Sequence, residues 1–98
     1  MSLAVVLTPE AQIDYDEAFD WYESKRRGLG VRFAGAVERA FNAIAAMPNM
    51  HAVVYRNLRS AVVRRFPYVI YYRVEPNQLV VVSVFHSRRD PSIWQKRV

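Results

Sequence analysis

The apolar residues of this chain change their spacing once, near Pro48, and this change restricts the fold more than any other feature. Before Pro48, apart from a short first strand, they recur every three or four positions and alanine is frequent, as in amphipathic helices. After Pro48, Val, Ile and Tyr gather in short runs separated by turn residues, as in β-strands. We therefore expect an α+β fold, with a helical hairpin packed on one face of a small antiparallel sheet.

The first half of the chain predicts one strand and two helices. An apolar run from Leu3 to Leu7 is followed by Thr8 and Pro9, which favour the N-cap and the first position of a helix. Gly28 is placed to end the first helix, and Pro48 ends the second. The apolar helix faces consist of Ala11, Tyr15, Ala18 and Tyr22, then Phe33, Val37, Phe41 and Ile44.

The second half predicts three strands, over residues 59–65, 68–74 and 79–86, with turns at 66–67 and 75–78. The expected order is therefore β-α-α-β-β-β. Asp90 and Pro91 follow the last strand and could cap one helical turn near Trp94. A chain of 98 residues has room for one core, so we expect a single domain over residues 1–98.

The turns predict which strand residues share a face of the sheet. A two-residue turn at 66–67 pairs Arg64 with Val69, and the second turn pairs Arg73 with Val80 and Tyr71 with Val82. One face would then be open, and the other, nearly all apolar, would receive the helices. A single β-bulge would exchange the faces of a strand. The open face is expected to carry Arg64, Val69, Tyr71, Arg73, Val80, Val82, Val84 and His86, and the covered face Tyr68, Ile70, Tyr72, Val74, Leu79, Val81, Ser83 and Phe85.

Charge is distributed unevenly along the chain. The net charge is +5, and twelve of the 14 basic residues are arginines, whose guanidinium groups bind phosphates and carboxylates with two hydrogen bonds. Residues 1–50 carry a net charge of −2, whereas residues 51–98 carry +7. An anionic partner is therefore expected, either nucleic acid or an acidic protein segment.

Several classes of function are excluded or disfavoured. The chain has no cysteine, so it has neither a disulfide framework nor a thiolate site, and its two histidines are far apart in sequence. We expect no metal and no cofactor. The longest apolar stretch, residues 79–85, is far shorter than the roughly 20 residues that cross a bilayer. The N-terminus lacks the basic start of a signal peptide. A cytoplasmic protein without a membrane partner is expected.

The expected open face supplies candidate functional residues. Arginine can stabilise a pentavalent phosphorane and histidine can transfer a proton near neutral pH, so Arg64, Arg73 and His86 are candidate catalytic residues. Each of these residue types also has a purely structural interpretation. The histidine would be an ordinary residue at a strand end, the tyrosines would be packing residues, and the arginines would form a solvated turn. The candidate residues for binding a partner or nucleic acid are Arg64, Arg65, Tyr71, Arg73, Arg88, Arg89 and Trp94.

Four segments in order support a family resemblance that covers nearly the whole chain. They are Ala18-Phe19-Asp20-Trp21-Tyr22-Glu23, Gly28-Leu29-Gly30 with Phe33, residues 65–72 (RFPYVIYY) and residues 84–91 (VFHSRRDP). Together with the β-α-α-β-β-β pattern, they resemble the RelE/ParE superfamily of bacterial toxins, often described as plasmid stabilisation proteins. The resemblance implies the toxin of a type II toxin-antitoxin module, held inactive in a hetero-oligomer by a cognate antitoxin whose C-terminal segment wraps it.

The superfamily divides by target. Its RelE-like branch consists of ribosome-dependent mRNA endonucleases, whose chemistry Arg64, Arg73 and His86 would suit, whereas its ParE-like branch is associated with inhibition of DNA gyrase and typically lacks such catalytic groups. The chain has no lysine between Arg27 and Gln95, and Trp94 stands where a tail tyrosine is expected. These departures weaken the nuclease interpretation. The aromatic segment at residues 18–23 and the ending at residues 85–91 (FHSRRDP) favour the ParE-like branch, which would not be an enzyme. An alternative of another class is a plain basic nucleic-acid-binding module that uses Arg64, Tyr71 and Arg73 as a stacking and phosphate platform.

Overall fold

The computed structural model describes residues 3–98. It contains the expected order of elements with one additional strand, β2, before the three expected strands. The elements are β1 (Ala4–Leu7), α1 (Pro9–Lys25), α2 (Leu29–Ala46), β2 (Val53–Tyr55), β3 (Leu58–Val62), β4 (Tyr68–Val74), β5 (Gln78–His86) and α3 (Ser92–Gln95).

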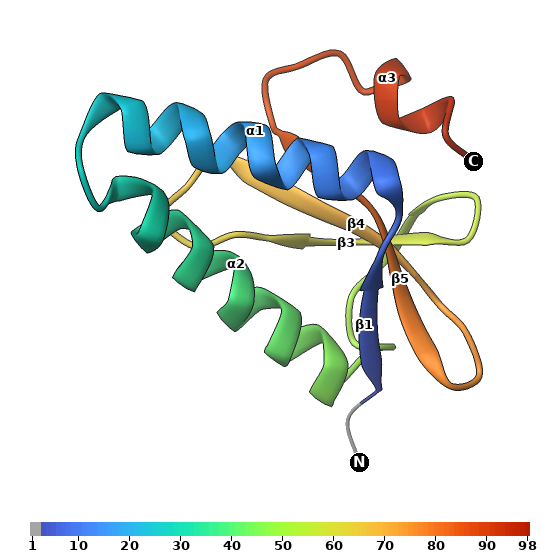
Figure 1. Cartoon of the computed structure of the whole chain (residues 1–98). Coiled ribbons are helices and arrows are strands. Elements are labelled where there is room, and N and C mark those ends of the chain that lie inside the picture. The colour runs from blue at the N-terminus through green and yellow to red at the C-terminus, as the bar shows by residue number, and fades with distance from the viewer. Residues whose placement is uncertain (1–2) are drawn as a thin grey trace.

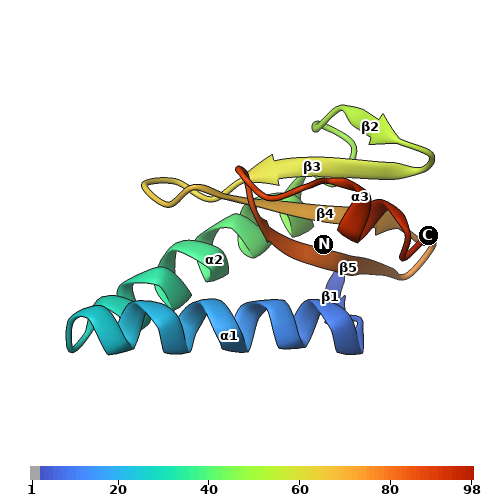
Figure 2. The ribbon, with the colours of Figure 1, turned by 90° about the horizontal axis from the view of Figure 1, so that it is seen from above.

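The five strands form one sheet in the order β1-β5-β4-β3-β2. β1 runs parallel to β5, and the other three neighbouring pairs are antiparallel. The sheet is therefore mostly antiparallel. The parallel pair β1–β5 requires a long crossover connection, and this connection includes the helical hairpin. In Figure 1, α2 lies below the sheet and α3 above it. Figure 2 shows α1 and α2 diverging from their short connecting turn.

The start of α1 follows the local signals in the sequence. The hydroxyl oxygen of Thr8 accepts a hydrogen bond from the backbone N–H of Ala11 at 3.1 Å, and Pro9 is the first helical residue. Ala11, Ala18 and Tyr22 are buried, as the helical spacing predicts. This cap and stripe fix the direction in which α1 leaves β1.

The turn between α1 and α2 differs from the expectation that Gly28 ends the first helix. α1 ends earlier, at Lys25, and Gly28 stands directly before α2 with a φ of +86°, a conformation that glycine adopts easily. The Glu23 carboxylate accepts hydrogen bonds from the N–H groups of Gly28 and Gly30 at 2.9 and 2.8 Å. The bond from Gly28 is the main cause that lowers the pKa of Glu23. A side chain of α1 therefore closes this turn.

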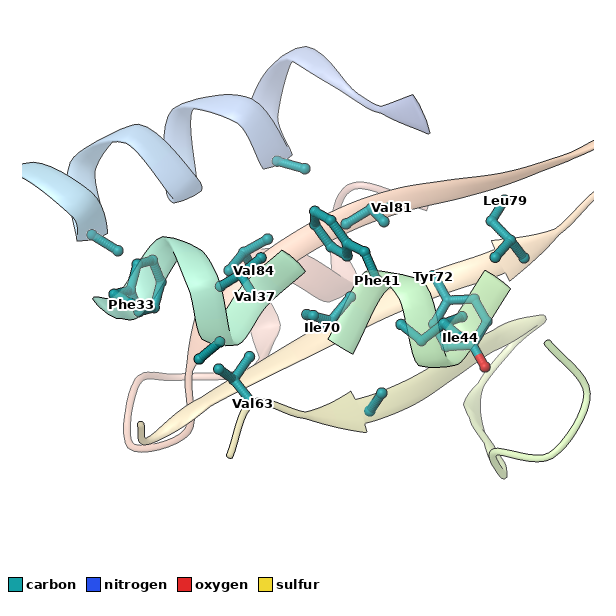
Figure 3. Packing of buried hydrophobic residues seen from close by; sticks show 14 of the residues in the cluster. Phe33, Val37, Phe41, Ile44, Val63, Ile70, Tyr72, Leu79, Val81 and Val84 are labelled. Carbon is teal, nitrogen blue, oxygen red and sulfur yellow. The ribbon is translucent and has the colours of Figure 1, made fainter. Parts of the chain in front are cut away.

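One face of the sheet, here called the helix face, packs against α1 and α2. The predicted apolar stripe of α2 is buried: Phe33, Val37 and Ile44 are at most 1% exposed and Phe41 is 9% exposed. Figure 3 shows these side chains directed at strand residues that include Ile70 and Tyr72. The strand residues that define the helix face are Ala61, Ile70, Tyr72, Leu79, Val81 and Val84.

The opposite face, here called the tail face, is not open as the sequence suggested. A second apolar cluster forms there around Trp94, which is 4% exposed. Its ring stacks on Tyr71 with the centroids 3.8 Å apart, and it meets Tyr55 edge-on at 5.6 Å. The segment after β5 therefore folds back and covers the middle of this face. The strand residues that define the tail face are Leu58, Tyr71, Val80, Val82 and Phe85.

The turn between β3 and β4 is longer than the two residues expected. Val62 pairs with Val69, and the N–H of Val63 donates to the carbonyl of Tyr68 at 2.9 Å, so the pairing is displaced by two residues from the expected one. Because the displacement is even, β3 keeps the faces predicted for it. Arg64 consequently lies in the turn and not in the strand.

Candidate functional site

A β-bulge in β5 separates residues that the sequence placed on one face. Arg73 pairs with Val80 as expected, but Tyr71 pairs with Ser83 instead of Val82, so the register shifts by one residue at this point. Beyond the shift, every side chain of β5 points to the face opposite to the one expected. Val84 enters the core on the helix face, whereas Phe85 joins the cluster on the tail face.

The bulge is held in place by a carboxylate from α1. Asp14 accepts hydrogen bonds from the Val84 N–H at 3.2 Å and from the Ser83 hydroxyl at 3.3 Å. The Arg97 guanidinium donates to both carboxylate oxygens of Asp14, at 2.6 and 3.1 Å, and to the Val82 carbonyl at 3.0 Å. The hydrogen bonds to Asp14 raise the pKa of Arg97. Asp14 therefore joins α1, the bulge and the segment after β5.

The candidate catalytic residues Arg64, Arg73 and His86 do not lie on one face of the sheet. Arg64 is exposed in the β3–β4 turn, and Arg73 lies on the tail side of the sheet in an ion pair with Glu75 at 2.9 Å. His86 pairs with Tyr68 across the strands, with the two rings edge-on at 5.3 Å. The expectation that His86 shares a face with Arg73 is wrong, because the bulge intervenes.

His86 also has a local structural task. Its Nδ1 accepts a hydrogen bond from the backbone N–H of Arg88 at 3.1 Å, and its carbonyl accepts one from the N–H of Arg89 at 3.1 Å. The imidazole therefore presents only Nε2 to other partners. These two hydrogen bonds close the turn after β5, and the Arg89 guanidinium lies over the ring of Phe85 in that strand at 4.9 Å.

Two of the candidate binding residues, Tyr71 and Trp94, are packing residues in this structure. They stack on each other on the tail face, and burial raises the pKa of the Tyr71 phenol. The expected cap of the last helical turn is present, because the Asp90 carboxylate accepts a hydrogen bond from the Ser92 N–H at 3.0 Å.

Four of the other five candidate binding residues, all except Arg73 in β4, lie on two adjacent loops. The Ser87 N–H donates to the Pro67 carbonyl at 2.8 Å, which joins the loop that carries Arg88 and Arg89 to the turn that carries Arg64 and Arg65. All four of these arginines are exposed.

A groove of about 840 Å³ lies between α1 and the end of β5. Its lining by Ile13 and Trp21 was not predicted from the sequence. Ile13 and Trp21 of α1 line it and are each 55% exposed, which is unusual for large apolar side chains on one helix. Their spacing of eight residues, outside the buried stripe of α1, was the available signal. We define this α1–β5 groove by Ile13, Trp21, Tyr68, His86, Arg88 and Arg89.

The rims of the α1–β5 groove carry opposite charges. Glu10 and Glu17 line it from α1, and Arg88 and Arg89 line it from the loop after β5. The Asp14–Arg97 pair also lines the groove but is internally neutral. The groove thus presents apolar side chains between an acidic and a basic edge.

Within residues 3–98, no helix is both long and apolar enough to cross a membrane. The same residues contain no group of three or more His, Asp or Glu side chains that could hold a metal ion.

The fold is that of a toxin-antitoxin protein of known structure. A solved chain described as "Chromosomal ParDE TA system from P. aeruginosa" superposes with a TM-score of 0.75 at 15% sequence identity, over 87% of this chain and 96% of that one. A search of curated proteins found no match. A family model described as the ParE toxin of the type II toxin-antitoxin system, parDE, matches residues 5–91. The chain belongs to this family, so it is a ParE-like type II toxin, and the superfamily expected from the sequence is confirmed.

Proposed function

We propose that this toxin inhibits DNA gyrase in the cytoplasm without cutting RNA, and that its antitoxin neutralises it by placing a segment in the α1–β5 groove. The ParE family match makes a cognate antitoxin the expected partner. The separation of His86 from Arg73 by the bulge is the observation that carries the choice of gyrase over RNA.

A ribonuclease that uses the 2′-hydroxyl as nucleophile needs its basic and proton-transferring groups within hydrogen-bond reach of one phosphate. Here Arg73 is paired with Glu75 on the tail side, and His86 points to the other side of the sheet. The Nδ1 atom of His86 is occupied by the Arg88 N–H. This distribution favours a toxin that acts by binding its target.

The α1–β5 groove suits a segment of an antitoxin that carries apolar anchors and acidic residues. Exposed Trp21 and Ile13 offer contact area of the kind that dominates binding energy at protein interfaces. Arg88 and Arg89 would attract acidic side chains and increase the association rate. A segment that is anchored on Trp21 and runs along the arginines would use both features.

The choice of target is tested by inducing the toxin without its antitoxin and measuring transcript integrity and DNA breaks in the same cells. The variants are His86→Gln and Arg73→Gln, compared with the wild type. We expect intact transcripts and DNA breaks in all three strains. Transcripts cut by the wild type alone would contradict the proposal, since a nuclease should lose about 10² to 10⁴ in rate without its proton donor. Co-purification with the antitoxin checks that each variant is folded.

The groove is tested by replacing Trp21 with alanine. An anchor residue contributes about 2 kcal/mol or more to binding, so we expect antitoxin affinity to fall about 30-fold or more. The control is Val31→Ala, which truncates a side chain that is 62% exposed on α2. Equal antitoxin affinity of the two variants, measured by titration calorimetry, would place the antitoxin elsewhere.

A further inference from the structure

Most of the positive charge of this protein gathers on three connections that are far apart in the sequence. Residues 24–32, 63–68 and 86–89 hold eight of the 14 basic residues and no Asp or Glu. All eight side chains are exposed. We call this surface the basic end and define it by Lys25, Arg26, Arg27, Arg32, Arg64, Arg65, Arg88 and Arg89.

Aromatic packing and one backbone hydrogen bond hold the three connections at one end of the molecule. The Phe66 ring, at the tip of the β3–β4 turn, packs against Tyr22 at the end of α1 and Phe33 near the start of α2, with centroid distances of 5.0 and 5.4 Å. The Ser87 N–H binds the Pro67 carbonyl. Figure 2 shows the α1–α2 turn and the β3–β4 turn toward the same end, with the loop after β5 starting beside the second.

Nearby carboxylates are engaged elsewhere. Glu23 accepts the N–H groups of Gly28 and Gly30, and Asp90 accepts the N–H of Ser92. Within residues 3–98, the side-chain ion pairs are Arg73–Glu75 and Arg97–Asp14, and neither uses a residue of the basic end. Lys25 and Arg89 lie over the Trp21 and Phe85 rings at 5.0 and 4.9 Å, and the charge of Arg27 contributes to the lowered pKa of Glu23. None of the eight residues is in a side-chain ion pair within the described part of the chain, so their charges are available to an external anion.

The backbone of the β3–β4 turn is strained at Arg65, which has a φ of +71°. Arg56 in the β2–β3 turn has a positive φ of 52° as well, so positive φ is a feature of both turns and does not mark the basic end. At Arg65 the turn brings the next ring, that of Phe66, against Tyr22 and Phe33.

The basic end does not resemble a site for single strands or for a peptide. Single-stranded nucleic acids bind through exposed rings on which their bases stack. Here Phe66 and Tyr68 turn inward against Phe33, at 5.4 and 5.1 Å. A peptide needs apolar anchors, and those lie in the α1–β5 groove. The exposed apolar side chains beside the basic end are Trp21, whose ring lies 5.0 Å from the Lys25 Nζ, and Val31. One exposed ring does not stack a run of bases, so this surface of seven arginines and one lysine fits a regular row of phosphates better.

We propose that the basic end binds the phosphate backbone of double-stranded DNA without reading its sequence. A duplex about 20 Å long carries roughly a dozen phosphates, and the smallest extent of the molecule is 22 Å. A duplex segment about as long as the molecule is thick can therefore contact several arginines at once. This activity goes beyond the proposed inhibition of gyrase, and the basic end shares Arg88 and Arg89 with the α1–β5 groove.

The experiment measures binding to a fluorescent 20-base-pair duplex by anisotropy at several salt concentrations. The test variant is Arg26→Gln/Arg64→Gln/Arg88→Gln, which removes one charge from each connection. The control is Arg39→Gln/Arg56→Gln/Lys96→Gln, which removes the same net charge from exposed residues outside the basic end. Each lost phosphate contact reduces the slope of log K against log salt by about 1, so the test variant should lose up to about 3.

At 0.1 M salt we expect the test variant to bind at least about tenfold more weakly than the wild type and the control to bind within about twofold of it. Equally weakened DNA binding in both variants would mean that net charge alone determines the affinity, and this result would overturn the proposal. Tighter binding of a single-stranded RNA of the same length would overturn the choice of duplex DNA. Loss of antitoxin binding with unchanged DNA binding in the test variant would make the basic end an antitoxin surface instead.

Discussion

The two faces of the sheet are covered by very different structures. The helix face lies under two helices of 17 and 18 residues and packs into one large cluster. The tail face lies under a four-residue helix, one indole ring and the Arg97 side chain. The same strands, and in β5 the same continuous run of buried residues, supply both faces.

This difference predicts unequal local stability. Segments with few apolar contacts open at a lower free energy than the global unfolding reaction. The segment after β5 should therefore detach from the tail face while the helix face stays folded. Three substitutions test this ranking, from the largest expected effect to the smallest.

Phe33→Ala should have the largest effect, because Phe33 is fully buried and touches Tyr22, Phe66 and Tyr68. Removal of a buried phenyl ring costs about 3–5 kcal/mol of unfolding free energy. Denaturant titration measures it, with the exposed Val31→Ala as control, for which a change within about 0.5 kcal/mol is expected. A cost below about 1 kcal/mol would contradict the dominance of the helix face.

Trp94→Ala should cost about 3 kcal/mol, near the lower limit for a buried aromatic ring, because the short segment can settle onto the sheet. The loss should appear mainly as faster hydrogen exchange in residues 87–98, with α2 protected as before. Ile93→Ala, at a residue that is 39% exposed, is the control. Equal acceleration of exchange in α2 would mean that the two faces unfold as one unit.

Asp14→Asn should have the smallest effect of the three, about 2 kcal/mol, although breaking a buried ion pair costs about 3–5 kcal/mol. The side chains of Arg97 and Asp14 retain 16% and 11% of their exposure, which reduces the penalty. Once Asp14 has been replaced by asparagine, Arg97→Met should cost less than in the wild type, because the two residues act on each other. Additive losses in this double-mutant cycle would remove Asp14 as the link between the faces.

The helix face could be predicted from the sequence because its signals are local. Thr8 and Pro9 mark the start of α1, and the spacing of Phe33, Val37 and Phe41 defines the buried side of α2. Each of these signals lies within one helix. The helical half of the fold was therefore predictable to within a few residues.

The tail face and the position of His86 could not be predicted in the same way. Residues 79–85 are all buried, so their apolar character does not indicate which residue faces which side. The carboxylate that fixes the bulge belongs to Asp14, 70 residues before the Val84 N–H that it binds. No pattern within β5 contains that information.

The candidate site was predicted in part. The arginine pairs at 64–65 and 88–89 come together at one end as adjacent loops, although the expected turn between strands was too short. The apolar lining of the α1–β5 groove was missed because Ile13 and Trp21 lie on the otherwise charged side of α1, outside its buried stripe. Exposed apolar residues at helical spacing are the signal to seek in such chains.

The parallel pairing of β1 with β5 also sets the time at which this toxin can first fold. Ala4 pairs with Gln78, so the first strand finds its neighbour more than 70 residues later in the chain. At synthesis rates of about 5–20 residues per second, a nascent chain waits about 4–15 seconds before β5 exists. During that interval β1 lacks its hydrogen-bonding partner and the groove beside α1 has no second wall. The order of strands thus delays the appearance of the first folded toxin after translation of its own chain begins.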